Sequence, residues 1–141
     1  MDNNLKQQHS SIYKSIFIID PVKGERLQLA KLLKQEKFLM TTYINLAGCF
    51  KQTNPIKPDL AIYVLRKDKN EPSQLKTIRK NFKKIHFIIL LTPDIPELNV
   101  TEFREHGFTS IHKAGNQDMV KELIYSLMPE CQVTKAEELS T

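Results

Sequence analysis

The sequence predicts an α/β fold with a five-stranded, doubly wound parallel sheet that helices cover on both faces. Short, uninterrupted apolar runs such as SIFIID (15–20) and HFIILL (86–91) are typical of strands buried on both faces. Segments with apolar residues at helical spacing alternate with these runs, which is the pattern of a parallel sheet with helical crossovers. Because such crossovers are right-handed, the expected strand order is 2-1-3-4-5.

The five predicted strands are short and rich in apolar residues. They cover residues 15–20, 38–44, 59–65, 86–91 and 110–112. The fourth has the strongest pattern of a buried strand, and Thr92 ends it before Pro93. The second is more weakly patterned, and the fifth is brief.

Two helices are predicted between the first three strands. In the first, Leu29, Leu32 and Leu33 share one face, and lysines point away from it. The second is a short segment after strand two, with Ala47 and Phe50 on its apolar side. We expect both apolar faces to pack against the sheet.

Three further helices are predicted in the second half of the chain. Ser73 is expected to cap the third helix. This helix carries apolar residues at helical spacing, namely Leu75, Ile78 and Phe82. The fourth covers 98–106 and is stopped by Gly107, a residue type favoured just after a helix. The fifth covers 116–128, and Pro129 ends it.

Composition and charge exclude several classes of protein. The 141 residues include only two cysteines, which excludes a disulfide scaffold and a four-cysteine zinc site. The four glycines are isolated, which excludes a glycine-rich phosphate loop, and the histidines lack the spacing of metal ligands. We therefore expect no metal and no cofactor. The net charge of +5 is compatible with nucleic acid or an acidic partner and is diagnostic of neither.

One domain with two polar ends is the expected organisation. A polar segment covers residues 1–13, the sheet and its helices occupy 14–128, and a polar tail or linker covers 129–141. The first residues lack the apolar run of a secretory signal, and no stretch approaches the ~20 apolar residues of a membrane helix. We therefore expect a soluble cytoplasmic protein without a membrane partner.

Four stretches of the sequence resemble the receiver domains of response regulators in two-component signalling. They are IFIID, PDLAIYVL, FIILLT and HKAGNQDMVKELI, and the resemblance extends over residues 15–128. It implies a flavodoxin-like receiver fold. In that family, two adjacent acids after strand one and an aspartate at the end of strand three hold Mg²⁺, and the last of these accepts a phosphoryl group. A Thr or Ser after strand four and a Lys after strand five contact the phosphoryl oxygens.

The chain matches this pattern at three of the five positions. By the resemblance, Asp20 corresponds to the first acid, Thr92 to the hydroxyl and Lys113 to the lysine. Pro21 replaces the second acid, and Val64 replaces the phosphate-accepting aspartate. Valine cannot attack phosphorus, and a single carboxylate is a poor site for Mg²⁺. The resemblance therefore implies the fold without the activity: a pseudo-receiver that is not an enzyme.

The loss of these acids leaves Asp20 and Lys113 without the partners that the family provides. We expect the two side chains to pair across the end of the sheet and to lock one conformation. The alternative is that the Lys113 side chain extends into water and pairs with no acid.

A basic stripe lies on the predicted third helix. It is made up of Lys76, Arg79, Lys80 and Lys83. The stripe lies opposite the apolar residues of that helix and could meet phosphates or an acidic protein, and the alternative is a solvated helix face. No aromatic residue is interleaved with these charges in the manner of base stacking, so nucleic-acid binding is the less favoured interpretation.

The favoured function is a phosphorylation-independent signalling module that binds a protein partner. The resemblance implies that the partner, or a second copy in a homodimer, docks on the surface from Leu98 to Met128. The module is either a stand-alone adaptor or the first part of a transcription regulator, whose separate output domain would bind DNA. Two alternatives remain: an active receiver phosphorylated at an unusual residue such as Asp68, and a basic nucleic-acid-binding domain.

Overall fold

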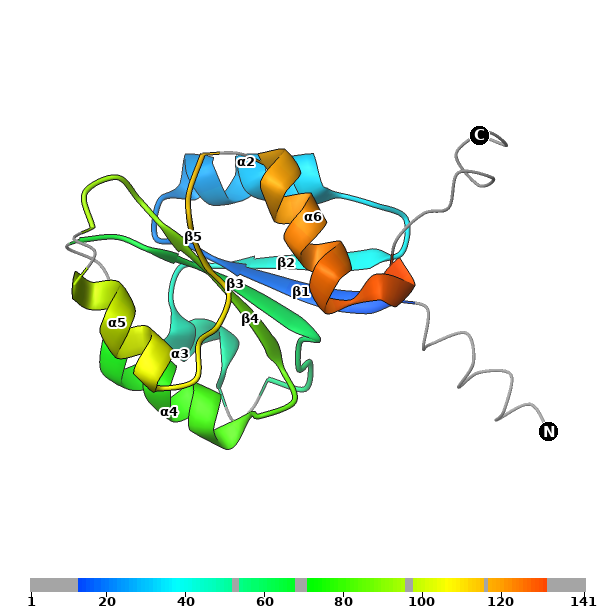
Figure 1. The fold of residues 1–141 in the computed structure, drawn as a ribbon. Coiled ribbons are helices and arrows are strands. Elements are labelled where there is room, and N and C mark those ends of the chain that lie inside the picture. The colour runs from blue at the N-terminus through cyan, green and yellow to red at the C-terminus, as the bar shows by residue number, and fades with distance from the viewer. Residues whose placement is uncertain (1–12, 52–53, 68–70, 96–97, 116, 132–141) are drawn as a thin grey trace.

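A computed structural model describes residues 13–51, 54–67, 71–95, 98–115 and 117–131. Within these ranges, five strands form one parallel sheet in the order β2-β1-β3-β4-β5, which confirms the predicted fold class (Figure 1). The strands are β1 (Lys14–Ile19), β2 (Phe38–Tyr43), β3 (Leu60–Leu65), β4 (His86–Leu91) and β5 (Ile111–Lys113). The helices are α2 (Lys23–Leu33), α3 (Leu46–Cys49), α4 (Pro72–Asn81), α5 (Leu98–Glu105) and α6 (Gln117–Leu127). Of the helices in the described ranges, none has both the length and the apolar character to cross a membrane.

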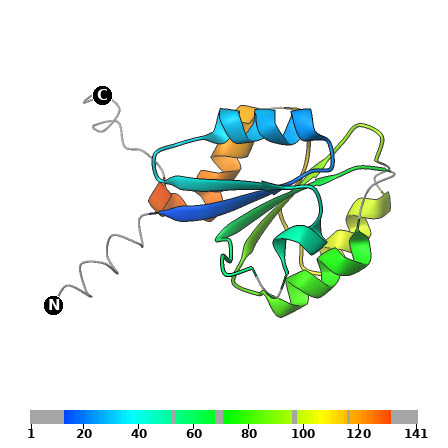
Figure 2. The same cartoon turned by 180° about the vertical axis from the view of Figure 1, so that it is seen from behind.

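The helices lie in two layers, one on each face of the sheet (Figure 1, Figure 2). One layer is α2 and α6, and the other is α3, α4 and α5. Side chains alternate between the faces along each strand, so a strand contributes to two apolar cores. In β1, Ile16 and Ile18 pack in the core beneath α2 and α6, whereas Phe17 and Ile19 pack in the core beneath the other layer. Burial on both faces accounts for the uninterrupted apolar runs of the strands.

The strands in the middle of the sheet are more buried than those at its edges. All six residues of β3, which lies between β1 and β4, are buried. β2 forms one edge of the sheet (Figure 2), and Leu39 on this strand is 57% exposed. The edge position explains the weaker apolar pattern of this segment in the sequence.

The apolar faces of α2 and α3 differ from those predicted. In α2, Leu29 and Leu33 are buried, but Leu32 is 39% exposed, because only the i, i+4 stripe of the helix faces the sheet. The helix α3 is a single turn that buries its first and last residues, so Ala47 lies on its exposed side. Phe50 follows this turn and packs against the core, as expected.

Most element boundaries lie within one residue of those predicted, and the starts of α4 and β5 differ for identifiable reasons. Helix α4 begins at Pro72, which occupies the first helical position, where a missing N–H group leaves no helical hydrogen bond unmade. Glu71 precedes it, and Ser73 lies in the first turn instead of capping the helix. Strand β5 begins at Ile111, one residue later than predicted, and Ser110 is buried beside it.

The ends of α5 and α6 follow the signals in the sequence. Gly107 follows α5 with a φ of +95°, a left-handed conformation that favours glycine. Pro129 follows α6 and begins η1 (Pro129–Cys131), a short 3-10 helix at the start of the predicted polar tail. There the Glu130 carboxylate lies 3.2 Å from the Lys14 ammonium at the start of β1, which ties η1 to the sheet.

Candidate functional site

The carboxyl ends of the strands form one edge of the sheet, the edge at which doubly wound folds bind ligands. Asp20 directly follows β1, Val64 lies near the end of β3, and Thr92 directly follows β4. Together with Arg66, these residues line a cavity of about 510 Å³ that α2 and α6 border. Lys113 ends β5 and lines the neighbouring groove. The structure thus gathers Asp20, Val64 and Thr92 around one cavity and places Lys113 in the groove beside it.

The Asp20 carboxylate is bound by groups of this chain. Arg66 Nε donates to its Oδ1 at 2.7 Å and Arg66 Nη2 donates to its Oδ2 at 2.8 Å, which makes a bidentate ion pair. The backbone N–H of Val22 donates a further hydrogen bond to Oδ1 at 2.9 Å. Asp20 is 1% exposed, so its charge is shielded from water. The hydrogen bond to Asp20 raises the pKa of Arg66, and burial opposes this shift.

The predicted pair between Asp20 and Lys113 is wrong. Two strands, β3 and β4, lie between β1 and β5, so three strand spacings, roughly 14 Å, separate the two residues. Arg66 follows the strand that is adjacent to β1 and reaches the carboxylate directly. The Lys113 side chain is exposed, and no carboxylate of the described residues pairs with it. Extension into water, the alternative for Lys113, is therefore what the structure supports.

The Thr92 hydroxyl has hydrogen-bond partners close to its own loop. It hydrogen-bonds the Asp94 carboxylate, and the Leu65 carbonyl oxygen, a second acceptor, lies 3.1 Å from Oγ1. The backbone N–H of Thr92 donates to the same carbonyl at 3.2 Å. The hydrogen bond from Thr92 lowers the pKa of Asp94. The hydroxyl therefore holds the turn after β4 to the end of β3.

The residues of the cavity do not fit Mg²⁺. Of the three acids that the receiver pattern requires, Asp20 alone is present, because Pro21 and Val64 occupy the other positions. The guanidinium of Arg66 binds both oxygens of Asp20, and its positive charge repels a cation. Val64 is 5% exposed and packs in the core beneath α2 and α6, so its position offers no oxygen to a metal. Among the described residues, no group of three or more His, Cys, Asp or Glu side chains is arranged to hold a metal ion.

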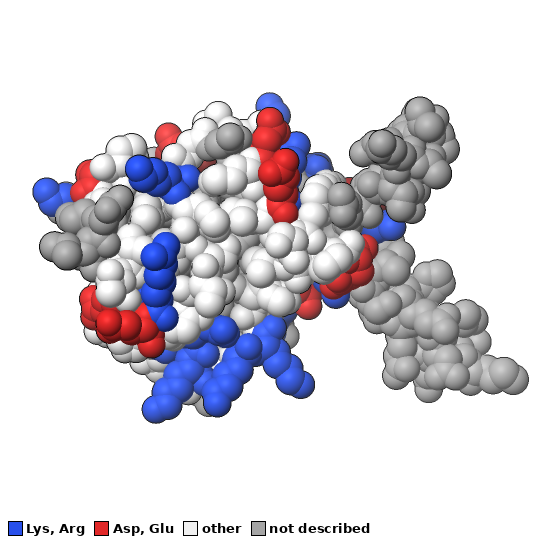
Figure 3. Space-filling view, viewed as in Figure 1, with Lys and Arg blue, Asp and Glu red and all other residues white. Residues whose placement is uncertain are grey.

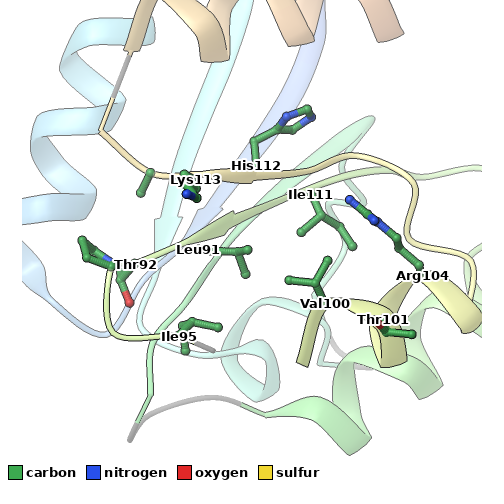
Figure 4. A pocket seen from close by; sticks show the side chains of 11 residues that line it. Leu91, Thr92, Ile95, Val100, Thr101, Arg104, Ile111, His112 and Lys113 are labelled. Carbon is green, nitrogen blue, oxygen red and sulfur yellow. The ribbon is translucent and has the colours of Figure 1, made fainter. Parts of the chain in front are cut away.

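A second hollow, a groove of about 860 Å³, lies between α5, β5 and the end of β4 (Figure 4). Its floor is apolar and includes Leu91, Ile95, Val100 and Ile111. Its rim is basic, because its described lining residues include Arg104, His112 and Lys113 and no acid. Burial, with a smaller contribution from Arg104, lowers the pKa of His112. An apolar floor with a cationic rim suits a protein segment that carries both apolar and acidic side chains.

The structure divides the predicted basic stripe of α4. Lys76 pairs with the Glu102 carboxylate of α5, and this hydrogen bond lowers the pKa of Glu102. Arg79 turns back onto the fold and donates hydrogen bonds to two backbone carbonyls. Lys80 and Lys83 are exposed. The stripe therefore consists of two exposed lysines, Lys80 and Lys83, and of two side chains, Lys76 and Arg79, that are bound by other groups of the chain.

Sequence reasoning missed Arg66 and Glu71. The Glu71 carboxylate accepts a hydrogen bond from the N–H of Leu46 at 3.0 Å, and the N–H of Glu71 donates to the Tyr63 hydroxyl at 2.9 Å. These bonds join α3, β3 and the start of α4, and burial raises the pKa of Tyr63. A charged residue immediately after a strand, at the edge where ligands bind, is the signal that would have found Arg66. Asp68, the alternative phosphate acceptor, lies outside the described residues.

Similarity to solved structures decides the assignment of the fold. No protein-family model matches the sequence, and no curated protein matches it. A response regulator from Thermotoga maritima matches the structure with a TM-score of 0.70 at 14% sequence identity, over 83% of this chain and 98% of that chain. The fold is that of a receiver domain.

Two further solved structures support the same assignment. A CheY-like response-regulator receiver domain protein from Methanospirillum hungatei matches with a TM-score of 0.66 at 16% identity, over 84% of this chain and 96% of that chain. The Salmonella typhimurium response regulator RcsB matches with a TM-score of 0.68 at 13% identity, over 89% of this chain and 68% of that chain. At these identities the likeness shows the receiver fold, and the chemistry has to be argued from the residues of this chain.

Proposed function

We propose that this receiver-fold chain is a phosphorylation-independent signalling module that works by binding a protein partner. The observation that carries the proposal is the bidentate ion pair of Asp20 and Arg66 beside Val64. Phosphotransfer to a receiver needs an aspartate nucleophile and a divalent cation that neutralises the transferred group. In this chain Val64 occupies the position of the aspartate nucleophile. The Arg66 guanidinium binds the Asp20 carboxylate that would hold the cation. The proposed module is therefore not an enzyme and takes no cofactor.

Arg66 places a guanidinium on the carboxylate that would hold a metal in a receiver. For Mg²⁺ to reach Asp20, the ion pair would have to open, and the two charge-assisted hydrogen bonds from Arg66 would be lost. Neither Pro21 nor Val64 has a side-chain oxygen that would offset this loss. Without a phosphoryl group to shift its conformation, the module would be regulated by a partner, a ligand or its own concentration.

Incubation with acetyl phosphate, a small phosphodonor, and Mg²⁺ tests this proposal. Intact-mass spectrometry is expected to show no stable gain of a phosphoryl group, because position 64 carries no nucleophile. A stable gain that disappears in Asp68→Asn and persists in Asp59→Asn would instead establish an active receiver with an unusual acceptor. Asp59 is the matched control, because it precedes β3 at the opposite edge of the sheet, where its carboxylate accepts the Ser15 N–H.

The proposed partner surface is the region 98–128, which contains α5, β5 and α6. This region and the end of β4 line the groove beside α5 and β5. The apolar floor and basic rim of the groove suit a partner that presents apolar and acidic side chains (Figure 4). Two copies of this chain that met through the groove would place the cations Arg104 and Lys113 of both copies in one interface. Like charges would then face each other, which favours a different protein over a homodimer on this surface.

Charge reversal at the rim of the groove tests the partner surface. The wild-type chain and an Arg104→Glu variant are used to capture proteins from a lysate of the native organism. A partner is expected to be recovered about tenfold less with Arg104→Glu, because its acidic side chains would then meet a negative charge. Lys31→Glu, which reverses an exposed charge on α2, is expected to retain it. Equal recovery with all three proteins would contradict this placement of the partner.

A further inference from the structure

A second charged surface lies over the carboxyl-terminal end of α4, away from the cavity at the strand ends. Lys80, Lys83 and Lys84 are exposed there, and the Lys57 ammonium lies 5.5 Å from the centroid of the Phe82 ring. In Figure 3, Lys and Arg side chains gather along the lower edge of the molecule, over α4. Within the described part of the chain, none of these four lysines forms an ion pair. The surface therefore carries positive charge that the chain itself does not neutralise.

Arg79 lies in the middle of this surface and is held by neutral groups. Its Nε donates to the carbonyl of Gly107 at 3.3 Å, and its Nη1 donates to the carbonyl of Lys83 at 3.2 Å. The guanidinium carbon lies 5.8 Å from the centroid of the Phe87 ring. No carboxylate of the described residues pairs with Arg79. The guanidinium thus keeps its charge at a defined place, and less side-chain freedom is lost when an anion binds to it.

Part of this surface, Arg79, Lys80 and Lys83, lines a hollow of about 560 Å³ between α4 and the end of α5. The basic residues that line it are Lys76, Arg79, Lys80 and Lys83. One acid, Glu105, also lines the hollow, and Lys76 is balanced by Glu102. Four positive charges less these two negative charges leave a surplus of two positive charges in the hollow. An anionic ligand with two or more charges would neutralise it.

We propose that this hollow binds a short acidic segment of a protein partner. Lys76 and Lys80 are one helical turn apart, about 6 Å along α4, and Lys83 continues the row beyond the end of the helix. About two extended residues cover these 6 Å, and one or two more reach Lys83. Two carboxylates on one segment can therefore meet Lys80 and Lys83, the cations of this row that form no ion pair among the described residues. The proposal concerns a surface remote from Asp20 and does not depend on the absence of phosphorylation.

The shape of the hollow favours a protein segment over nucleic acid. An extended peptide can lie between α4 and the end of α5, whereas a duplex is convex and would contact only the rim of a hollow between two helices. The residues that line the hollow include no Phe, Tyr or Trp on which a base could stack. The hollow would therefore recognise a ligand through the attraction between its basic side chains and the carboxylates of the ligand.

Fluorescence anisotropy with a labelled peptide of four consecutive glutamates flanked by glycines tests the proposal. At low salt, about 20 mM, the peptide is expected to bind the wild-type chain, and about tenfold more weakly the double variant Lys80→Gln/Lys83→Gln. The matched control is Lys31→Gln/Lys34→Gln, which removes the same charge at the same spacing from exposed positions at the end of α2. Its affinity is expected to stay within about twofold of that of the wild type.

Three results would overturn the proposal. Equal weakening by both double variants would mean that net charge alone attracts the peptide. Tighter binding of a short DNA duplex of equal charge, lost in Lys80→Gln/Lys83→Gln, would assign the hollow to nucleic acid. No binding of the peptide to the wild-type chain at low salt would also contradict it. The acetyl phosphate experiment does not involve these lysines, so the two proposals stand or fail separately.

Discussion

Replacing Arg66 by methionine is expected to lower the free energy of unfolding by about 3 kcal/mol. Methionine keeps an apolar stem, but the Asp20 carboxylate, in a residue that is 1% exposed, loses its counter-charge and two hydrogen bonds. Among the described residues, the N–H of Val22 is the donor that remains to this carboxylate. A buried charge without a partner is destabilising because its surroundings solvate it poorly. Urea denaturation followed by circular dichroism measures the loss.

Lys113→Met is the matched control for this measurement. It removes a cation from the same edge of the sheet, and its free energy of unfolding is expected to stay within about 0.5 kcal/mol of that of the wild type. The double variant Asp20→Asn/Arg66→Met removes both charges and is expected to regain part of the lost stability. If Arg66→Met and Lys113→Met prove equally stable, the Asp20–Arg66 pair does not hold this edge together.

Truncating Phe17 to alanine is expected to lower the free energy of unfolding by about 4 kcal/mol. Phe17 is fully buried on β1, and its ring centroid lies 4.8 Å from that of Tyr43 and 6.2 Å from that of Phe50. Alanine would leave a cavity between the sheet and the layer of α3, α4 and α5, because strands fixed by hydrogen bonds cannot close in on it. The loss is a large part of the about 5–15 kcal/mol that holds a domain folded, so a denaturant titration should show a much lower midpoint.

Leu39→Ala is the control for the truncation of Phe17. Leu39 lies on the adjacent strand β2 but is 57% exposed, so its truncation is expected to cost less than about 1 kcal/mol. A loss as large as that of Phe17→Ala would contradict the exposure of this edge. It would mean that another molecule covers β2 in solution, which sedimentation velocity would detect as a dimer.

The positions of the strands were predictable from the sequence because both faces of the strands are buried. A strand such as β3, in which every residue is buried, is apolar throughout and stands out without an alternating pattern. The faces of the helices were harder to predict. Leu32 and Leu33 are chemically identical, and the packing of α2 against β1, β2 and α6 decides which of them is buried. Ala47 was misplaced because a helix of one turn has no periodicity to read.

The residue type at position 64 could be read directly from the sequence, whereas the partner of Asp20 had to be inferred from the strand order and was missed. A residue type alone excludes an oxygen ligand, so Val64 could be assigned by counting along the third strand. The choice of partner depends on which strand end lies beside Asp20 and on how far each side chain reaches. Arg66 and Lys113 both lie at strand ends of the same edge, but β3 and not β5 is the neighbour of β1. The predicted strand order already contained this adjacency, and it was the available signal for Arg66.

The ion pair of Asp20 and Arg66 limits how this part of the molecule can change by mutation. An aspartate introduced at position 64 alone would compete with Asp20 for one guanidinium and would still lie near Pro21. An acid at position 21 alone would place a second negative charge beside a carboxylate that is already bound. Building a metal centre at this edge therefore requires coordinated substitutions at positions 21, 64 and 66. Stepwise change from this sequence is accordingly less open to phosphate chemistry than to diversification of the surfaces that we propose meet other proteins.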